Sequence, residues 1–209
     1  MRLFQAIQPR SAEQIPEPPI AKFLFADTRI AWFWLIVRLY VGYAWFSAGF
    51  EKLTGYSIFG EVQKGGSWIF TATPGVGMKG FAMGAIAQMS GAHPSVQGWY
   101  GWFLANVVVP NAGVFAYIIT FGEVLVGLGL IFGCLTGIAA FFGLVMNLNF
   151  MLAGAVSINP VIGTLALFLV LAWRIAGYYG IDFYLLPVLG TPWTGSLARK
   201  REIKVVPSS

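Results

Sequence analysis

Residues 113–133 read GVFAYIITFGEVLVGLGLIFG and contain a single charged residue, Glu123. A helix of about 20 such residues is long enough to cross the hydrocarbon core of a bilayer. A carboxylate at that depth is costly unless it finds a partner, so it marks a candidate functional site. This stretch therefore predicts a membrane-spanning helix with a polar group in its middle.

The composition of the whole chain supports the same class of protein. Charged residues make up 10% of the chain, hydrophobic residues make up 57%, and the mean hydropathy is +0.73. Soluble domains carry about 25% charged residues, so an integral membrane protein is indicated. The formal net charge of +5 comes from basic residues near the chain ends and forms no stripe typical of nucleic-acid binding. We expect contacts with membrane lipid and none with nucleic acid.

Cysteine and histidine usage limits the chemistry that the chain can perform. The single cysteine, Cys134, excludes an intrachain disulfide and a C-x-x-C redox pair. The single histidine, His93, has no second histidine with which to share a metal, so no metal site is predicted. Residues 1–28 contain scattered charges and prolines but no apolar core typical of a signal peptide. We expect them to form a cytoplasmic lead.

Four apolar stretches are long enough to cross a bilayer. They lie at about 29–50, 113–132, 137–156 and 160–179, within a predicted membrane domain of residues 29–190. These stretches must be helical, because lipid leaves exposed strand edges without hydrogen-bond partners. The predicted fold is an all-α membrane protein, a four-helix transmembrane bundle with a long extracytoplasmic segment, residues 52–112, between spans one and two.

Lysine and arginine near the spans predict the orientation. The basic residues of the two ends are Arg2, Arg10, Lys22 and Arg29 in the lead, and Arg199, Lys200, Arg201 and Lys204 in the tail of residues 191–209. An even number of spans places both ends in the cytoplasm. We expect a multi-pass protein of the inner (plasma) membrane with cytoplasmic N- and C-termini.

The outer segment of residues 52–112 is too long for a structureless loop, and it is rich in aromatic residues. The sequence predicts a weak amphipathic helix at 77–90 and an interfacial or re-entrant helix at 97–109, ended by Pro110. Two roles remain open for the segment. It caps the bundle, or it forms a lid over a site that opens to the outer leaflet or docks a second subunit.

Arg38 is the charged residue inside the first span and is the expected partner of Glu123. Counted from Arg29 and Gly133, the two side chains lie roughly 13 and 15 Å deep at 1.5 Å per residue. One interpretation is a structural ion pair that fixes helix register. The other is a catalytic centre that binds a head group such as a quinone, with Glu123 taking a proton and Arg38 holding a carbonyl or an anion.

Further polar residues accompany this pair. Asn147 and Asn149 are expected near the same level, where amides bond across helices, and with Lys52 they are candidate quinone-binding residues. Arg174 lies near the cytoplasmic end of the fourth span, and Asp182 follows it. We expect Arg174 to reach a lipid head group or Asp182, and we assign both residues a structural polar role.

The order and spacing of these residues resemble the DoxX family of small four-span membrane proteins. Arg38–Gly42 followed by Gly49–Lys52 is similar to the family's R-x-x-x-G…G-x-x-K signature. Glu123 with Gly127 and Gly133 is similar to its E-x-x-x-G-x-x-x-x-x-G run. Two shorter pieces also resemble the family, Thr136–Ala140 at the start of span three and the closing G-x-x-x-x-D element at Gly177–Asp182.

In length and in residues 147–160 the chain is more similar to the DoxD branch, the large subunit of thiosulfate:quinone oxidoreductase. This resemblance implies oxidation of thiosulfate to tetrathionate with a quinone as electron acceptor, and a small DoxA-type partner subunit. Similar folds work through cysteine pairs, which this chain does not contain. Two hypotheses therefore remain open. The first is a catalytic subunit of a quinone-linked oxidoreductase, and the second is a non-enzymatic scaffold or accessory subunit of a larger membrane complex. A transporter is a weaker third hypothesis, because no inverted repeat is visible.

Overall fold

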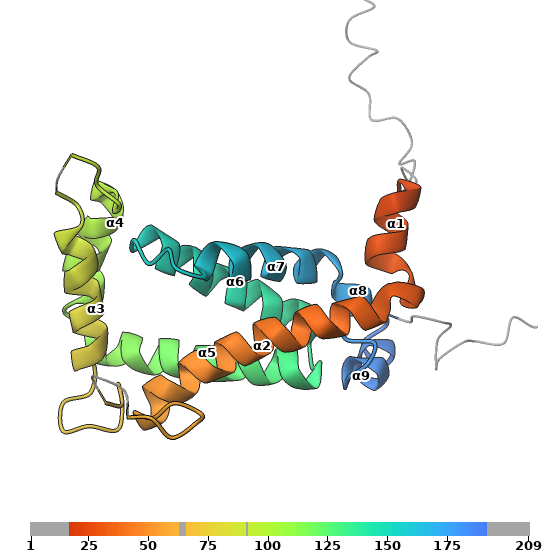
Figure 1. Ribbon diagram of the computed structural model, residues 1–209, viewed down its shortest axis with the longest axis horizontal. Helices are drawn as coiled ribbons and strands as arrows, with labels where there is room; N and C mark the ends of the chain where they lie inside the picture. The colour runs from red at the N-terminus through yellow and green to blue at the C-terminus, as the bar shows by residue number, and fades with distance from the viewer. Residues whose placement is uncertain (1–16, 63–65, 91, 192–209) are drawn as a thin grey trace, which may run out of the picture.

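The computed structural model describes residues 17–62, 66–90 and 92–191, and this part of the chain is helical without a β-strand. Four helices form its body (Figure 1): α2 (Ala31–Thr54), α5 (Ala112–Phe132), α6 (Thr136–Leu152) and α7 (Asn159–Leu171). Helix α2 packs against α5, α5 against α6, α6 against α7, and α7 against α2. The predicted all-α class is confirmed, whereas bilayer crossing by all four helices stays a prediction.

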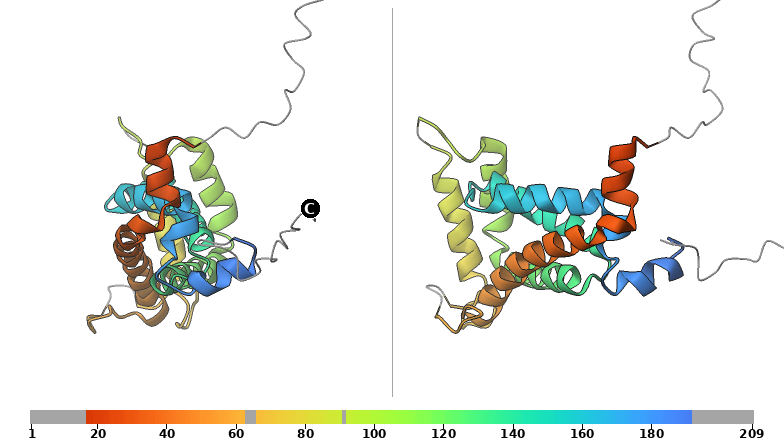
Figure 2. Two further views of the ribbon diagram at one scale, coloured as in Figure 1. Left: turned by 90° about the vertical axis from the view of Figure 1, so that its right-hand side faces the viewer. Right: turned by 45° about the vertical axis from the view of Figure 1, so that its right-hand side comes forward.

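Short helices stand at the two ends of this helical body (Figures 1 and 2). At one end lie α3 (Val76–Ala87), α4 (Gly98–Phe103) and the π-helical turn η3 (Leu104–Val108). At the other end lie α1 (Pro19–Ala26), η2 (Thr28–Ile30), α8 (Trp173–Ala176) and α9 (Asp182–Val188). The first and last described helices therefore share one end. The basic residues of the predicted tail, and those of residues 1–16, lie outside the described residues.

Among the described residues, two stretches are long and apolar enough to cross a membrane, Thr28–Thr54 and Ala112–Phe132, whereas α6 and α7 are shorter apolar helices. Helix α6 ends before the predicted limit of 156. Gly154 adopts a left-handed φ of 79°, and the Ala155 N–H donates to the Phe150 carbonyl at 3.0 Å. This is the hydrogen-bond pattern of a glycine-terminated helix. Helix α7 likewise ends before 179, since Ala172 separates it from α8.

The predicted helices of the outer segment are present. Helix α3 corresponds to the predicted helix at 77–90, and α4 with η3 corresponds to the one at 97–109. These elements form a second hydrophobic cluster against the end of the helical body, in which Met78, Tyr100 and Leu104 are buried. The segment thus closes one end of the body, while its predicted depth in the membrane interface stays a prediction.

Glycines set the register between α2 and α5. A Cβ atom at Gly49 would lie 2.7 Å from the Val124 nitrogen, and one at Gly42 would lie 3.0 Å from the Ile131 nitrogen. Only glycine allows backbones to approach this closely, and small residues serve this purpose in membrane helices. Because Gly49 faces Val124, the last turn of α2, which includes Lys52, lies beside the middle of α5.

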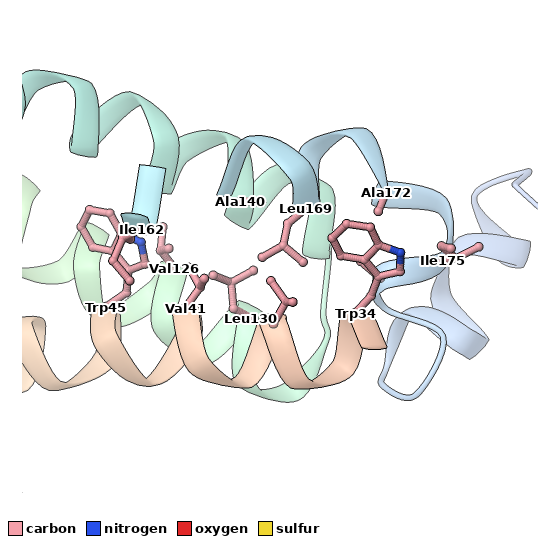
Figure 3. Packing of buried hydrophobic residues seen from close by; sticks show 12 residues of the cluster. Trp34, Val41, Trp45, Val126, Leu130, Ala140, Ile162, Leu169, Ala172 and Ile175 are labelled. Carbon is pink, nitrogen blue, oxygen red and sulfur yellow. The ribbon is translucent and has the colours of Figure 1, made fainter. Parts of the chain in front are cut away.

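Apolar side chains occupy both the inside and the outside of the helical body. Trp34, Val41, Leu130 and Leu169 are buried between the helices (Figure 3). The outward faces are also apolar, and each of the four helices exposes large hydrophobic side chains, among them Ile36, Leu125, Phe142 and Val161. Soluble monomers rarely expose continuous apolar surface on this scale, so these faces are typical of contact with lipid.

Candidate functional site

A buried ion pair joins α2 and α5. The Lys52 Nζ donates to the Glu123 Oε2 at 2.7 Å. The Glu123 side chain is 1% exposed and that of Lys52 is 19% exposed. Lys52 comes from the last turn of α2, where its Nζ also lies 3.4 Å from the Ala48 carbonyl oxygen. The partner of the Glu123 carboxylate is therefore a lysine.

The expected pair between Arg38 and Glu123 is wrong. The Arg38 Nη2 donates instead to the backbone carbonyl of Tyr179 at 3.0 Å. The side chain lies beside Gly133, at the end of α5, and is buried. Arg38 and Lys52 lie about 21 Å apart along α2 at 1.5 Å per residue, so they reach opposite parts of α5. The depths counted from Arg29 and Gly133 did not place the two side chains at one level, because α2 begins beyond the level at which α5 ends.

Asp182 belongs to a second polar cluster, near Arg38. Its carboxylate accepts hydrogen bonds from the N–H groups of Leu135 at 2.6 Å and Thr136 at 2.8 Å. These residues begin α6, where a carboxylate satisfies free N–H groups and is favoured by the helix dipole. The Asp182 N–H also donates to the Gly133 carbonyl at 2.7 Å. Asp182 therefore fixes the turn between α5 and α6.

Arg174 does not contact Asp182. Its Nη2 pairs with the Glu17 Oε1 at 3.0 Å, and both side chains are about half exposed. Of the two contacts expected for Arg174, the one with Asp182 is thus wrong, because Asp182 faces the start of α6. The head-group contact stays a prediction. An exposed pair of this kind contributes about 0–1 kcal/mol, so it does not define a site.

A cavity of about 350 Å³ adjoins the Lys52–Glu123 pair. Its walls come from α2, α5, α6, α7 and the outer segment, and most of its surface is apolar. The polar side chains in the lining are Lys52, Glu123 and Asn159. Trp45 and Ile162, which also line it, lie together at one end of the buried core (Figure 3). The cavity is therefore an apolar chamber with one ion pair in its wall.

Aromatic rings define the shape of this cavity. Trp45 stacks on Phe150 with the ring centroids 6.2 Å apart, and Phe81 meets Phe150 edge to face at 5.9 Å. The Lys52 Nζ lies 5.2 Å from the ring centroid of Trp68, within the range of a cation–π interaction. The backbone N–H of Trp68 donates to the backbone carbonyl of Lys52 at 2.8 Å. The outer segment thus folds onto the end of α2 and covers the ion pair.

The two predicted asparagines do not line this cavity. The Asn147 Nδ2 donates to the Asn159 Oδ1 at 3.2 Å, so Asn147 lies one hydrogen bond behind the cavity wall. Asn149 accepts a hydrogen bond from the Tyr100 hydroxyl at 3.2 Å and lines a separate cavity of about 170 Å³. Of the predicted site residues, the structure brings Lys52 and Glu123 together, places Asn147 behind them, and places Arg38 elsewhere.

Sequence reasoning did not identify Trp45 or Asn159 as residues of this site. One signal was available, since Ala44, Ala48 and Lys52 recur every four residues and share one face of α2. That face has two small side chains followed by a charge, which is what a cavity beside an ion pair requires. The part of the chain that the structure describes contains no cluster of three or more metal-ligating residues.

Comparison with known proteins identifies the family. The DoxX family model matches residues 33–159, which include most of α2, all of α5 and α6, and both members of the buried ion pair. No curated protein and no solved structure matches the chain. Because the family model covers more than half of the sequence, the chain belongs to the DoxX family of membrane proteins.

Proposed function

We propose that this protein is the quinone-binding membrane subunit of an oxidoreductase, and that its cavity holds the quinone head group. The observation that carries the proposal is the Lys52–Glu123 pair in the wall of an apolar, aromatic-lined cavity. An ion pair buried between membrane helices is costly to form and contributes little net stability. Ionisable groups in such positions are therefore candidates for binding or proton transfer.

The residues present fit a quinone ring. The cavity of about 350 Å³ lies within the range of roughly 300–1,000 Å³ typical of small-molecule sites. A quinone ring is flat and apolar, with two carbonyl oxygens that accept hydrogen bonds. Trp45 and Phe150 offer aromatic faces for the ring, and the Lys52 ammonium offers a charged donor for one carbonyl.

The ion pair can position the ligand and move a proton. A bound quinone accepts two electrons and two protons to become a quinol. The Lys52 ammonium would hold one carbonyl oxygen and stabilise the negative charge that develops there. Glu123 would orient this ammonium through the 2.7 Å contact between its Oε2 and the Lys52 Nζ. After the ammonium has given a proton to the reduced quinone, a protonated Glu123 would return one to the neutral amine. Both residues act from rigid helices, which favours a fixed geometry.

The proposed electron donor is thiosulfate, and the proposed site of its oxidation is a small DoxA-type partner subunit. Two thiosulfate ions joined as tetrathionate release the two electrons that one quinone takes up, so the reaction balances. The resemblance of residues 147–160 to the DoxD branch supports this donor. The single cysteine supports a partner, because the chain cannot form a thiol pair of its own.

The proposed membrane arrangement has four crossings with both termini in the cytoplasm of the cell and the outer segment outside. Helix α6, with 17 residues, is about 26 Å long, close to the thickness of a hydrocarbon core. Helix α7 continues into α8 after one residue and reaches a similar length. Exposed apolar side chains on all four helices and the basic residues near the chain ends support this arrangement.

A non-enzymatic accessory subunit is the second candidate function. Trp99 and Trp102 on α4 are exposed, and tryptophan is enriched in protein interfaces. It is also enriched where helices meet the membrane surface. An accessory role predicts stable association with other membrane proteins and no quinone in the cavity.

Bound quinone distinguishes the two candidates. The protein is purified in mild detergent, extracted with organic solvent and assayed for quinone by mass spectrometry. The wild type and Glu17→Gln, which changes an exposed carboxylate at the other end, are expected to retain quinone near stoichiometry. Glu123→Gln and Lys52→Met are expected to lose it while still eluting as folded protein. Absence of quinone from the wild type, or its retention in both site variants, would refute the proposal.

A further inference from the structure

The contact between α2 and α7 is the least extensive of the four helix contacts around the helical body. Ala44 and Ala48 are one turn apart on α2, and they line the cavity together with Asn159 and Ile162 of α7. Side chains as small as alanine do not fill the space between two helices. The cavity therefore lies beside the least extensive of the four helix contacts.

Three residues that line the cavity between α2 and α7 are apolar and partly exposed. Ala44 and Ala48 are partly exposed on α2, and Ile158, at the start of α7, is 49% exposed and lines the cavity. The outward side chains beside them, Tyr43 and Val161, are also exposed. The surface around the opening therefore belongs to the apolar outward faces that contact lipid in the proposed arrangement.

The side of the cavity that faces the outer segment is covered. Trp68 lies over the Lys52 ammonium and packs so closely on α3 that a Cβ atom at Gly77 would be 2.5 Å from its ring. Phe81, from the same helix α3, packs edge to face on Phe150. A ligand that approaches through water on this side meets two large aromatic side chains.

We infer that the ligand enters this cavity laterally from the lipid, through the opening between α2 and α7. The inference rests on the proposed function and narrows its substrate to a membrane-dissolved quinone with a long apolar tail. The head group would lie against the Lys52–Glu123 pair, and the tail would leave along Ala44 and Ala48 into the bilayer. Water-soluble quinones without a tail are not the substrate that this opening favours.

Exchange of quinone in lipid nanodiscs tests lateral entry. Protein loaded with a decyl-tailed benzoquinone is mixed with an excess of its isotope-labelled form dissolved in the nanodisc lipid, and bound label is followed by mass spectrometry. Ile158→Trp places a large side chain at the opening, and Ala48→Leu narrows the opening from α2. Val161→Trp is the matched control, because Val161 is 52% exposed three residues away but does not line the cavity.

We expect exchange in Ile158→Trp and Ala48→Leu to be slower by about tenfold, which corresponds to a barrier higher by about 1.4 kcal/mol. Exchange in Val161→Trp is expected to match the wild type. If both opening variants exchange as fast as this control, lateral entry is wrong, although bound quinone still supports the proposed function. If the wild type holds no quinone, the proposed function fails and the inference fails with it.

Discussion

Replacing Lys52 with methionine tests the buried ion pair most sharply. Methionine keeps most of the side-chain length but leaves the Glu123 carboxylate, which is 1% exposed, without its cation. Removing one partner of a buried pair costs about 3–5 kcal/mol, because the remaining charge is uncompensated. Glu123→Gln should cost less, about 2 kcal/mol, because Lys52 is 19% exposed and still faces Trp68.

The double variant Lys52→Met/Glu123→Gln removes both charges and should cost much less than the sum of the single variants. The expected coupling energy is about 2–3 kcal/mol, at the upper end for residues in contact. The free energy of unfolding is measured by reversible denaturation in mixed detergent micelles. The half-exposed pair of Glu17 and Arg174 provides the matched control, for which coupling below about 1 kcal/mol is expected.

Two outcomes would contradict this reasoning. Coupling between Lys52 and Glu123 no larger than that of the exposed control pair would show that the contact is not a desolvated ion pair. Large coupling between Arg38→Met and Glu123→Gln, with none for Lys52, would show that the register between α2 and α5 is wrong.

Further predictions concern two glycines and one exposed contact. Gly180→Ala should destabilise the fold by about 1–3 kcal/mol, because its Cβ atom would lie 2.5 Å from the Arg38 Nη1. Gly84→Ala, in open space on α3, should instead stabilise the fold by up to about 1 kcal/mol. Equal effects of the two substitutions in thermal denaturation would contradict this reasoning. The side-chain hydrogen bonds from Arg29 lower the pKa of Asp27 from 3.8 to about 2. This contact should therefore persist above pH 4 and weaken only as the pH falls toward 2, and a carboxyl NMR titration with a midpoint near the ordinary value would refute it.

The helices of this protein could be predicted from the sequence because hydropathy reports directly on them. The stretch predicted at 113–132 is α5 almost residue for residue, since a left-handed glycine, Gly133, ends it. The third stretch was predicted too long, because Gly154 ends α6 while the residues after it remain apolar. Hydropathy records which residues avoid water but not the backbone conformation that ends a helix.

The candidate site could be predicted only in part. Glu123 was found because it is a lone charge in an apolar stretch, and Lys52 because it ends a recognisable signature. Their pairing was missed because it depends on which turns of α2 and α5 face each other. That register follows from the close packing of Gly49 on Val124, a contact between residues 75 positions apart in the chain. Counting residues from the ends of two helices does not reveal it.

The outer segment shows a different limit. Its two helices could be predicted from composition and spacing, but the place of Trp68 could not. That indole reaches Lys52 because the Ser67 hydroxyl and the Trp68 N–H both bond to carbonyl groups in the last turn of α2. Such a return of a loop onto a helix end depends on a few local hydrogen bonds. The sequence signal for such a contact is weaker than the periodic pattern of apolar residues that indicates a helix.

Photocrosslinking with an azidoquinone is the most direct test of the cavity as the quinone site. The protein is labelled in membranes, digested and mapped by mass spectrometry, with Glu123→Gln as a control. We predict that the label falls on peptides containing residues 44–52 and 150–162, which supply Trp45 and Phe150 to the cavity, and that it disappears in the variant. Labelling near Arg38 and Gly133, or labelling unchanged by the substitution, would contradict a quinone site at Lys52 and Glu123.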